Sequence, residues 1–329
     1  MNNFFCSDYS RQVGEEIIGS ATNYQTYILV ECPTPWMTEA FNSKWVPENL
    51  RDLAIKTHSS KKSIRFLLIA NDESHRKKET TVLIYHKPEG LITGYQKHEF
   101  KIPKIEQVAE VVQKWLTGKN TDYQIENNIT RDILICTHGS HDQCCAKYGN
   151  PFYFHAKNAI SELELNHTRI WRSSHFGGHR FAPTAIDLPQ ARYYGKLDQD
   201  SFKAILTRTG EIQLLENVYR GWGILPNALQ VLEREIIFSQ GWKWFDNKVA
   251  GKILQQSLDN NTILAELSYE TPNGAFYTYQ SKLVKDEVKT RVIKGSCHAT
   301  QECVVVKYAV ASLDLVERKI PIHANSYSY

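Results

Sequence analysis

Residues 131–146 read RDILICTHGSHDQCCA, a short apolar segment followed by a polar one that is rich in cysteine and histidine. The segment 131–137 predicts a buried strand, and Cys136 stands at its carboxyl end, where α/β folds place their chemistry. The polar residues that follow lack apolar periodicity and end in Cys144 and Cys145, which predicts a loop that returns a second thiol toward the first. This stretch therefore favours an α/β fold with two thiols at one strand end.

A second predicted strand leads into a pair of imidazoles. Residues 168–182 read TRIWRSSHFGGHRFA, in which branched and aromatic residues predict a strand that ends shortly before His175 and His179. Gly177 and Gly178 permit the positive φ of a tight turn and leave room for an approaching cofactor. Each feature alone has an ordinary structural explanation, but together the two segments predict a bound metal or cluster.

The predicted order of elements repeats along the chain. Residues 24–118 read β-α-β-β-β-α, and residues 131–209 repeat that order. Two thioredoxin-like units in tandem would explain the repeat, within the α/β fold class. We therefore predict a first unit without metal ligands over 1–120, a second unit that carries the cysteine and histidine ligands over 121–210, and a small α+β region over 211–329. The helices of the two units are predicted over 47–57, 105–117, 152–164 and 200–208.

The region after residue 211 has a different predicted order of elements. Residues 226–258 read as helical, and residues 263–310 alternate as strands. Cys297, His298 and Cys303 lie in this region, but they lack an obvious fourth ligand for a metal site of their own. Cys32 ends the first strand of the first unit without a second cysteine or a histidine pair nearby, so we predict a buried thiol there.

These motifs resemble the sucrase/ferredoxin-like family, whose members carry a thioredoxin-like [2Fe-2S] ferredoxin domain. The resemblance is carried by CTHGSHDQCCA at 136–146 and SHFGGHRFA at 174–182, and it extends to YILVECPTPW at 27–36 and YRGWG at 219–223. Relatives bind a [2Fe-2S] cluster through two cysteines and two histidines. The resemblance therefore implies four ligands here: Cys136, Cys145, His175 and His179. The residues expected to support them are His138, His141, Cys144, Gly177, Gly178 and Arg180.

The implied function is electron transfer, with no catalytic residue singled out by the sequence. Two neutral imidazoles leave an oxidised cluster without net charge, whereas four thiolates would leave a double negative charge that repels an added electron. In Rieske centres such ligation moves the potential from about −400 mV to between roughly −150 and +300 mV. A second ring nitrogen also permits coupled proton transfer. We expect a redox partner protein or a small electron acceptor, with charge offered by Arg172, Arg180 and His141.

Two alternatives to a simple electron carrier stay open. A structural zinc ion on the same four ligands is disfavoured, because zinc sites usually space their cysteines by about two to four residues. A reductase would use the cluster to relay electrons to an unknown substrate bound between domains. Thiol–disulfide exchange lacks its usual Cys-x-x-Cys motif, and no pair among the 36 acidic residues stands out as a glycosidase site.

Composition and charge limit the possible partners and the cellular compartment of the protein. The chain has 329 residues and a net charge of +3, which is too slight to argue for a nucleic-acid partner. Its first residues lack the layout of a signal peptide, and no apolar stretch is long enough to cross a bilayer. Seven cysteines without a secretion signal fit a reducing compartment. We therefore expect a cytoplasmic protein without a membrane partner.

Overall fold

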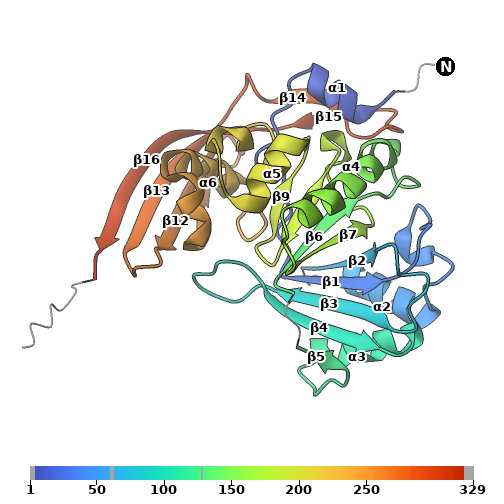
Figure 1. Cartoon of the computed structure of the whole chain (residues 1–329). Helices are drawn as coiled ribbons and strands as arrows, with labels where there is room; N and C mark the ends of the chain where they lie inside the picture. The colour runs from blue at the N-terminus through green and yellow to red at the C-terminus, as the bar shows by residue number, and fades with distance from the viewer. Residues whose placement is uncertain (1–3, 60–62, 127–128, 322–329) are drawn as a thin grey trace, which may run out of the picture.

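The computed structural model describes residues 4–59, 63–126 and 129–321, and its centre is one mixed sheet of ten strands (Figure 1). The strand order is β10-β9-β8-β6-β7-β2-β1-β3-β4-β5. The strands of the first unit are β1 (Thr26–Glu31), β2 (Ile64–Ala70), β3 (Thr80–His86), β4 (Gln96–Ile102) and β5 (Gln124–Ile125). Those that follow are β6 (Arg131–Cys136), β7 (Thr168–Ser173), β8 (Ala185–Leu188), β9 (Arg192–Tyr194) and β10 (Tyr219–Trp222).

Helices pack around this sheet. The α-helices are α1 (Cys6–Gln12), α2 (Glu48–Ser59), α3 (Val108–Leu116), α4 (Gln143–Glu162), α5 (Gln199–Thr207) and α6 (Asn227–Gln240). Short 3-10 helices are η1 (Ala40–Asn42), η2 (Ile105–Gln107), η3 (His179–Phe181), η4 (Ile212–Leu215) and η5 (Gly241–Asp246). None of the described helices combines the length and apolar character that crossing a bilayer requires.

The two units have the same internal topology. In the first unit β1 is parallel to β2 and antiparallel to β3, and β3 is antiparallel to β4. In the second unit β6, β7, β8 and β9 repeat these relations. The α/β class and the tandem order of elements predicted from the sequence are therefore confirmed. The boundaries of the three predicted domains stay a prediction.

The units are joined by a short contact and a shared core. Strands β2 and β7 pair only at Ile69↔Ser173 and Ala70↔Arg172. Leu67 and Leu83 of the first unit nevertheless belong to the same hydrophobic cluster as Ile133 and Trp171 of the second. A separate cluster lies between the other face of the first unit and helices α2 and α3. The apolar strands bury both faces, which explains their uninterrupted hydrophobic sequences.

A buried ionic network also connects the two units. Asp132 of β6 is fully buried and accepts hydrogen bonds from Arg169 at 2.7 Å, Trp171 at 2.8 Å and Tyr85 at 2.5 Å. Lys97 of β4 lies 2.8 Å from the same carboxylate. Because Tyr85 and Lys97 come from the first unit, the network links residues that are remote in sequence.

Helix α4 begins earlier than the sequence predicts. The sequence indicates a loop over 137–146 and a helix that starts at 152, after Pro151. Instead Asp142 is the N-cap, and its side chain accepts a hydrogen bond from the backbone of Cys144 at 2.9 Å. Pro151 lies inside the helix. The second thiol therefore stands on a helix rather than on a returning loop.

The C-terminal region departs from the prediction in one respect. The helix expected over 226–258 ends at Gln240, because Gly241 adopts a positive φ of 66° and stops it. A four-stranded sheet follows, in the order β11-β12-β13-β16. Its strands are β11 (Lys248–Gln256), β12 (Thr262–Glu270), β13 (Phe276–Lys285) and β16 (Tyr308–Lys319), and a hairpin of β14 (Arg291–Lys294) and β15 (Glu302–Val305) is inserted before the last.

Candidate functional site

The site lies where two parallel strands end side by side. Strands β6 and β7 are in register so that Cys136 is opposite Ser173, and the chain then continues from Ser173 into the histidine loop. Because both carboxyl ends meet at one edge of the sheet, the first thiol lies beside that loop. Helix α4 packs onto the same edge, since a methyl group added to Gly149 would come within 1.9 Å of the Cys136 carbonyl oxygen.

The two predicted thiol ligands are buried together. Cys136 is 2% exposed and Cys145 is 1% exposed. Burial acts to raise the pKa of Cys136, but the contact with Cys145, the amides of His138 and Phe176, and the charge of Arg220 bring it below its usual value. The contact with Cys136, followed by burial, raises the pKa of Cys145. Cys136 is thus the more acidic of the two thiols.

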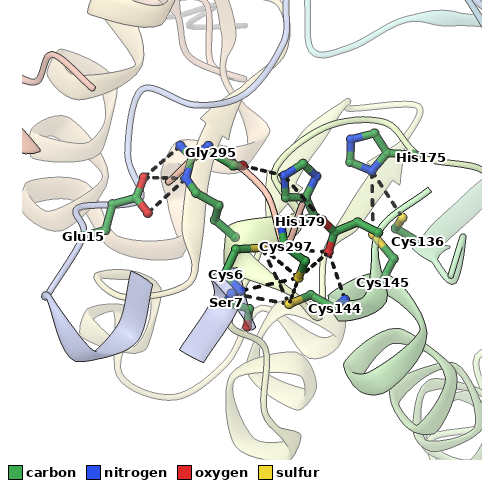
Figure 2. A network of polar contacts seen from close by, with 12 residues as sticks. Cys6, Ser7, Glu15, Cys136, Cys144, Cys145, His175, His179, Gly295 and Cys297 are labelled. Carbon is green, nitrogen blue, oxygen red and sulfur yellow. Dashed lines mark hydrogen bonds and ion pairs between the residues drawn. The ribbon is translucent and has the colours of Figure 1, made fainter. Parts of the chain in front are cut away.

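His175 lies against both thiols (Figure 2). Its Nδ1 atom is 3.9 Å from Sγ of Cys136 and 3.7 Å from Sγ of Cys145. On its other side the ring stacks on His141 with 4.0 Å between ring centroids. Burial, followed by the neighbouring histidines, lowers the pKa of His175 to about 2, so the ring is neutral at pH 7 and has a lone pair to offer.

His179 lies next to His175 but apart from the thiols. Its Nε2–H donates to the backbone oxygen of Gly295 at 2.6 Å, which leaves Nδ1 as the free lone pair. That Nδ1 atom is buried and has no hydrogen-bond partner among the described residues. Burial lowers the pKa of His179, although Asp142 opposes that shift. A buried nitrogen without a partner is a feature that a metal ligand would explain.

The four predicted ligands fall into two overlapping groups. Donor atoms of Cys136, Cys145 and His175 lie within 4.8 Å of one another, and so do those of His141, His175 and His179. His175 belongs to both groups, so it lies between the thiols at one end and His179 at the other. The arrangement is elongated and does not surround a single point.

A buried arginine that sequence reasoning missed holds the histidine loop. Arg220 of β10 donates to the backbone oxygen of Gly177 at 3.0 Å and to that of Ser20 at 2.7 Å. Gly178 has a φ of 81°, and a methyl group there would lie 2.4 Å from Cζ of Arg220. The YRGWG segment carries part of the family resemblance, but nothing in its spacing indicates that Arg220 reaches the loop.

The supporting residues have separate roles. His138 donates through Nε2 to the oxygen of Met37 at 2.7 Å and accepts the backbone N–H of His175 at 3.2 Å, so both its nitrogens are occupied. Arg180 pairs with the carboxylate of Glu15 at 2.8 Å. Cys144 points away from Cys136 and belongs to another group of side chains. Cys32 is fully buried, and burial raises its pKa to about 12.

A cavity of about 350 Å³ opens beside the histidines. It is lined by His141 and His175 together with Phe41, His58 and Arg65 of the first unit, among others. Arg65 also donates to the backbone oxygen of His175 at 2.7 Å. The cavity therefore gives access to the site from between the two units.

Fold and site together define an α/β protein with a buried cysteine–histidine centre at its strand ends. Residues 17–221 match the sucrase/ferredoxin-like family, and the chain belongs to that family. No curated protein matches the chain. A solved thioredoxin-like [2Fe-2S] ferredoxin from Aquifex aeolicus aligns at 14% identity over 29% of this chain and 94% of that one, with a TM-score of 0.24.

Proposed function

We propose that the chain is an electron-transfer protein that holds one [2Fe-2S] cluster through Cys136, Cys145, His175 and His179. The observation that carries the proposal is the convergence of the two thiols on Nδ1 of His175, beside a buried Nδ1 of His179 that has no partner among the described residues. When bound, such a cluster would supply a one-electron carrier with a potential raised by its imidazole ligands.

The histidines are prepared for ligation by their outer contacts. The backbone oxygen of Gly295 accepts the Nε2–H of His179 and so fixes the tautomer that presents Nδ1. Arg65 and His138 hold the backbone of His175 from two sides. These contacts orient both rings before any metal arrives, and such preorganisation favours binding.

The elongated arrangement favours a two-iron cluster over a single zinc ion. A tetrahedral zinc site requires all four donors around one point, at about 2.0–2.3 Å from the metal. No group of donor atoms within 4.8 Å of one another contains all four predicted ligands, each of which the structure describes. A cluster with two irons would accommodate four donors that do not all gather around one point.

The cavity beside His175 is the proposed route for electrons. His141 and His175 form part of its wall, and His175 also contacts the two thiols. A partner protein or a small electron acceptor would approach there, because it would come closest to a ligand side chain. Arg180 contributes little charge to such docking, since Glu15 neutralises it. The same cavity supports a second candidate function, a reductase whose substrate binds between the two units.

The first experiment is to record visible absorption and EPR spectra of anaerobically purified full-length protein, before and after dithionite. The proposal predicts charge-transfer bands that bleach on reduction and an S = 1/2 signal with an average g below that of all-cysteine ferredoxins. It also predicts iron and sulfide in equal amounts. Reoxidation of the reduced protein that depends on one added substrate would favour the reductase over the carrier.

A colourless protein would overturn the proposal. If the wild-type protein lacks iron and Cys136→Ser and His179→Ala each abolish zinc binding, the four residues form a structural zinc site instead. If His179→Ala keeps a normal cluster and His141→Gln loses it, the fourth ligand is His141 instead of His179.

A further inference from the structure

A second group of possible metal ligands lies at the start of α4, beside the proposed cluster ligands (Figure 2). Cys6 comes from α1, Asp142 and Cys144 from the beginning of α4, and Cys297 from the connection between β14 and β15. Their donor atoms all lie within 4.8 Å of one another. Three segments that are remote in sequence therefore bring three thiols and a carboxylate to one point.

The distances match the size of a mononuclear metal site. Sγ of Cys144 lies 3.6 Å from that of Cys6 and 3.3 Å from that of Cys297, and the latter two are 3.6 Å apart. Oδ1 of Asp142 is 3.1 Å from Sγ of Cys297 and 3.8 Å from Sγ of Cys6. A tetrahedron with metal–sulfur bonds of about 2.3 Å has sulfur–sulfur edges of about 3.8 Å. Disulfide bonds are much shorter, at about 2.05 Å.

The group is buried and rich in potential negative charge. Asp142 is 1% exposed, and both Cys6 and Cys144 are fully buried. His179 lies 4.0 Å from Asp142, but burial lowers the pKa of this histidine, so at neutral pH Asp142 has no charged ion-pair partner among the described residues. A buried carboxylate among three thiols is costly unless a cation compensates it. The arrangement therefore calls for a positive charge that no lysine or arginine among the described residues supplies.

Backbone N–H groups point at the sulfur and carboxylate atoms of the group, as they do around metal-bound thiolates. The N–H of Ser7 points at Sγ of Cys144 at 3.4 Å, and the N–H of Cys6 at Sγ of Cys297 at 3.5 Å. The N–H groups of Cys144 and Cys297 donate to the two oxygens of Asp142 at 2.9 and 3.0 Å. Such contacts orient ligand atoms and stabilise their charge.

We propose that Cys6, Asp142, Cys144 and Cys297 bind one Zn²⁺ ion, separate from the proposed cluster. Three thiolates and a carboxylate are ligands that zinc accepts, and four protein ligands leave no open position, as in structural sites. Cys297 is partly exposed, which gives the ion a way in. Cys6 and Cys297 lie outside the residues that match the family, so the site is a feature of this chain's additional segments.

The ion would tie α1 and the β14–β15 hairpin to the middle unit. It would hold α1 and the β14–β15 hairpin against the start of α4, where Cys144 precedes the proposed cluster ligand Cys145. Gly295, whose oxygen accepts the Nε2–H of His179, lies two residues before Cys297 in the same connection. The zinc site would thus stabilise the hairpin that orients one proposed cluster ligand.

Metal analysis of the full-length protein tests this proposal separately from the cluster. Zinc and iron are measured after anaerobic purification, and Zn²⁺ affinity is then measured by competition with a chromophoric chelator. We expect one zinc per chain in the wild type. Cys6→Ser and Cys297→Ser should each weaken Zn²⁺ binding at least about tenfold. Cys303→Ser is the matched control, because that thiol is exposed on the same hairpin and should leave zinc unchanged.

Two further variants distinguish loss of the zinc site from misfolding and from zinc bound at the proposed cluster site. Asp142→Asn keeps a helix-capping side chain but removes the ligand charge, so it should weaken zinc binding while the circular dichroism spectrum is retained. Cys136→Ser should keep the zinc whatever happens to iron. Wild-type protein that binds no zinc, or a Cys297→Ser variant that binds it as tightly as the wild type, overturns the proposal. A Cys144–Cys297 disulfide in zinc-free, anaerobically purified protein would do so as well.

Discussion

The guanidinium of Arg220 is 2% exposed and has no carboxylate in hydrogen-bond contact among the described residues. Burial lowers its pKa to about 10, so it stays charged at neutral pH, and its charge lowers the pKa of Cys136. A permanent positive charge next to a proposed thiolate ligand would also favour reduction of a bound cluster. If the proposed cluster is bound, Arg220 would raise its reduction potential.

Two substitutions of Arg220 distinguish the effect of its charge on the reduction potential from the effect of its hydrogen bonds on stability. We expect Arg220→Gln to lower the reduction potential by roughly 50 mV, which is about a tenfold change in a one-electron equilibrium. Arg220→Lys retains the charge but loses the planar fork, so it should destabilise the fold while leaving the potential closer to the wild type. Spectroelectrochemical titration and urea unfolding measure the two effects. Equal potentials in the two variants would show that the charge has no influence.

The proposed ligation by His175 and His179 is testable by exchanging each histidine for a thiolate. His175→Cys and His179→Cys should each keep a cluster and lower its potential, because an added thiolate makes the oxidised centre more negative. His141→Gln is the control, since His141 stacks on His175 without being a proposed ligand. Redox titrations of the three variants give the answer. Unchanged or raised potentials in both cysteine variants would contradict histidine ligation.

At the scale of elements, the histidine loop depends on two glycines that differ in their surroundings. Gly177 has a φ of 96°, and apart from its chain neighbours no atom of the described residues lies within 4 Å of where an added methyl group would be. Gly178 has a φ of 81° and faces Arg220. Gly177→Ala should cost only backbone strain, about 1 kcal/mol. Gly178→Ala adds a clash with a buried side chain and should cost about 3 kcal/mol. Urea unfolding measures both losses, and equal values would mean that the contact with Arg220 yields easily.

The start of α4 shows why the sequence misplaces an element boundary. The strands are predicted well, because apolar runs such as that of β6 are bounded by polar turns and are recognisable locally. The segment 137–150 is largely polar and is followed by Pro151, a helix-breaking residue, so a loop is the natural expectation. The cap made by Asp142 overrides it by satisfying the backbone of Cys144. Tertiary contacts of Cys144 and Cys145 then hold that first turn.

At the scale of the whole molecule, the network around Asp132 joins the two units. Asp132→Asn removes one of the two carboxylates that compensate Arg169 and Lys97, the other being Glu99, and breaking a buried pair typically costs about 3–5 kcal/mol. We therefore expect a loss near the lower end of that range in the free energy of unfolding. Glu110→Gln is the control, because its pair with Lys114 is exposed and should leave stability unchanged. A small loss for Asp132→Asn would mean that Glu99 alone compensates Arg169 and Lys97.

The same network predicts a pH dependence. Burial acts to raise the pKa of Asp132, but Arg169 and Lys97 bring it below its usual value. Because the folded pKa lies below the unfolded one, the stabilisation is complete above about pH 4 and is lost as pH falls through the folded value. The stability difference between wild type and Asp132→Asn should therefore shrink in acid. Unfolding curves from pH 7 to pH 3 measure it, and a constant difference would contradict the assignment.

The sequence by itself determined the α/β class, the repeated order of elements and the two segments that carry the candidate ligands. These features depend on burial patterns and backbone preferences that act over a few residues, so they can be recognised locally. Only the tertiary structure decided that Arg220 holds the histidine loop, and that Cys144 joins Cys6 and Cys297 instead of Cys136. Cys6 and Cys297 are 291 positions apart. Such contacts depend on how the elements pack in three dimensions, and the spacing of residues along the chain does not indicate that packing.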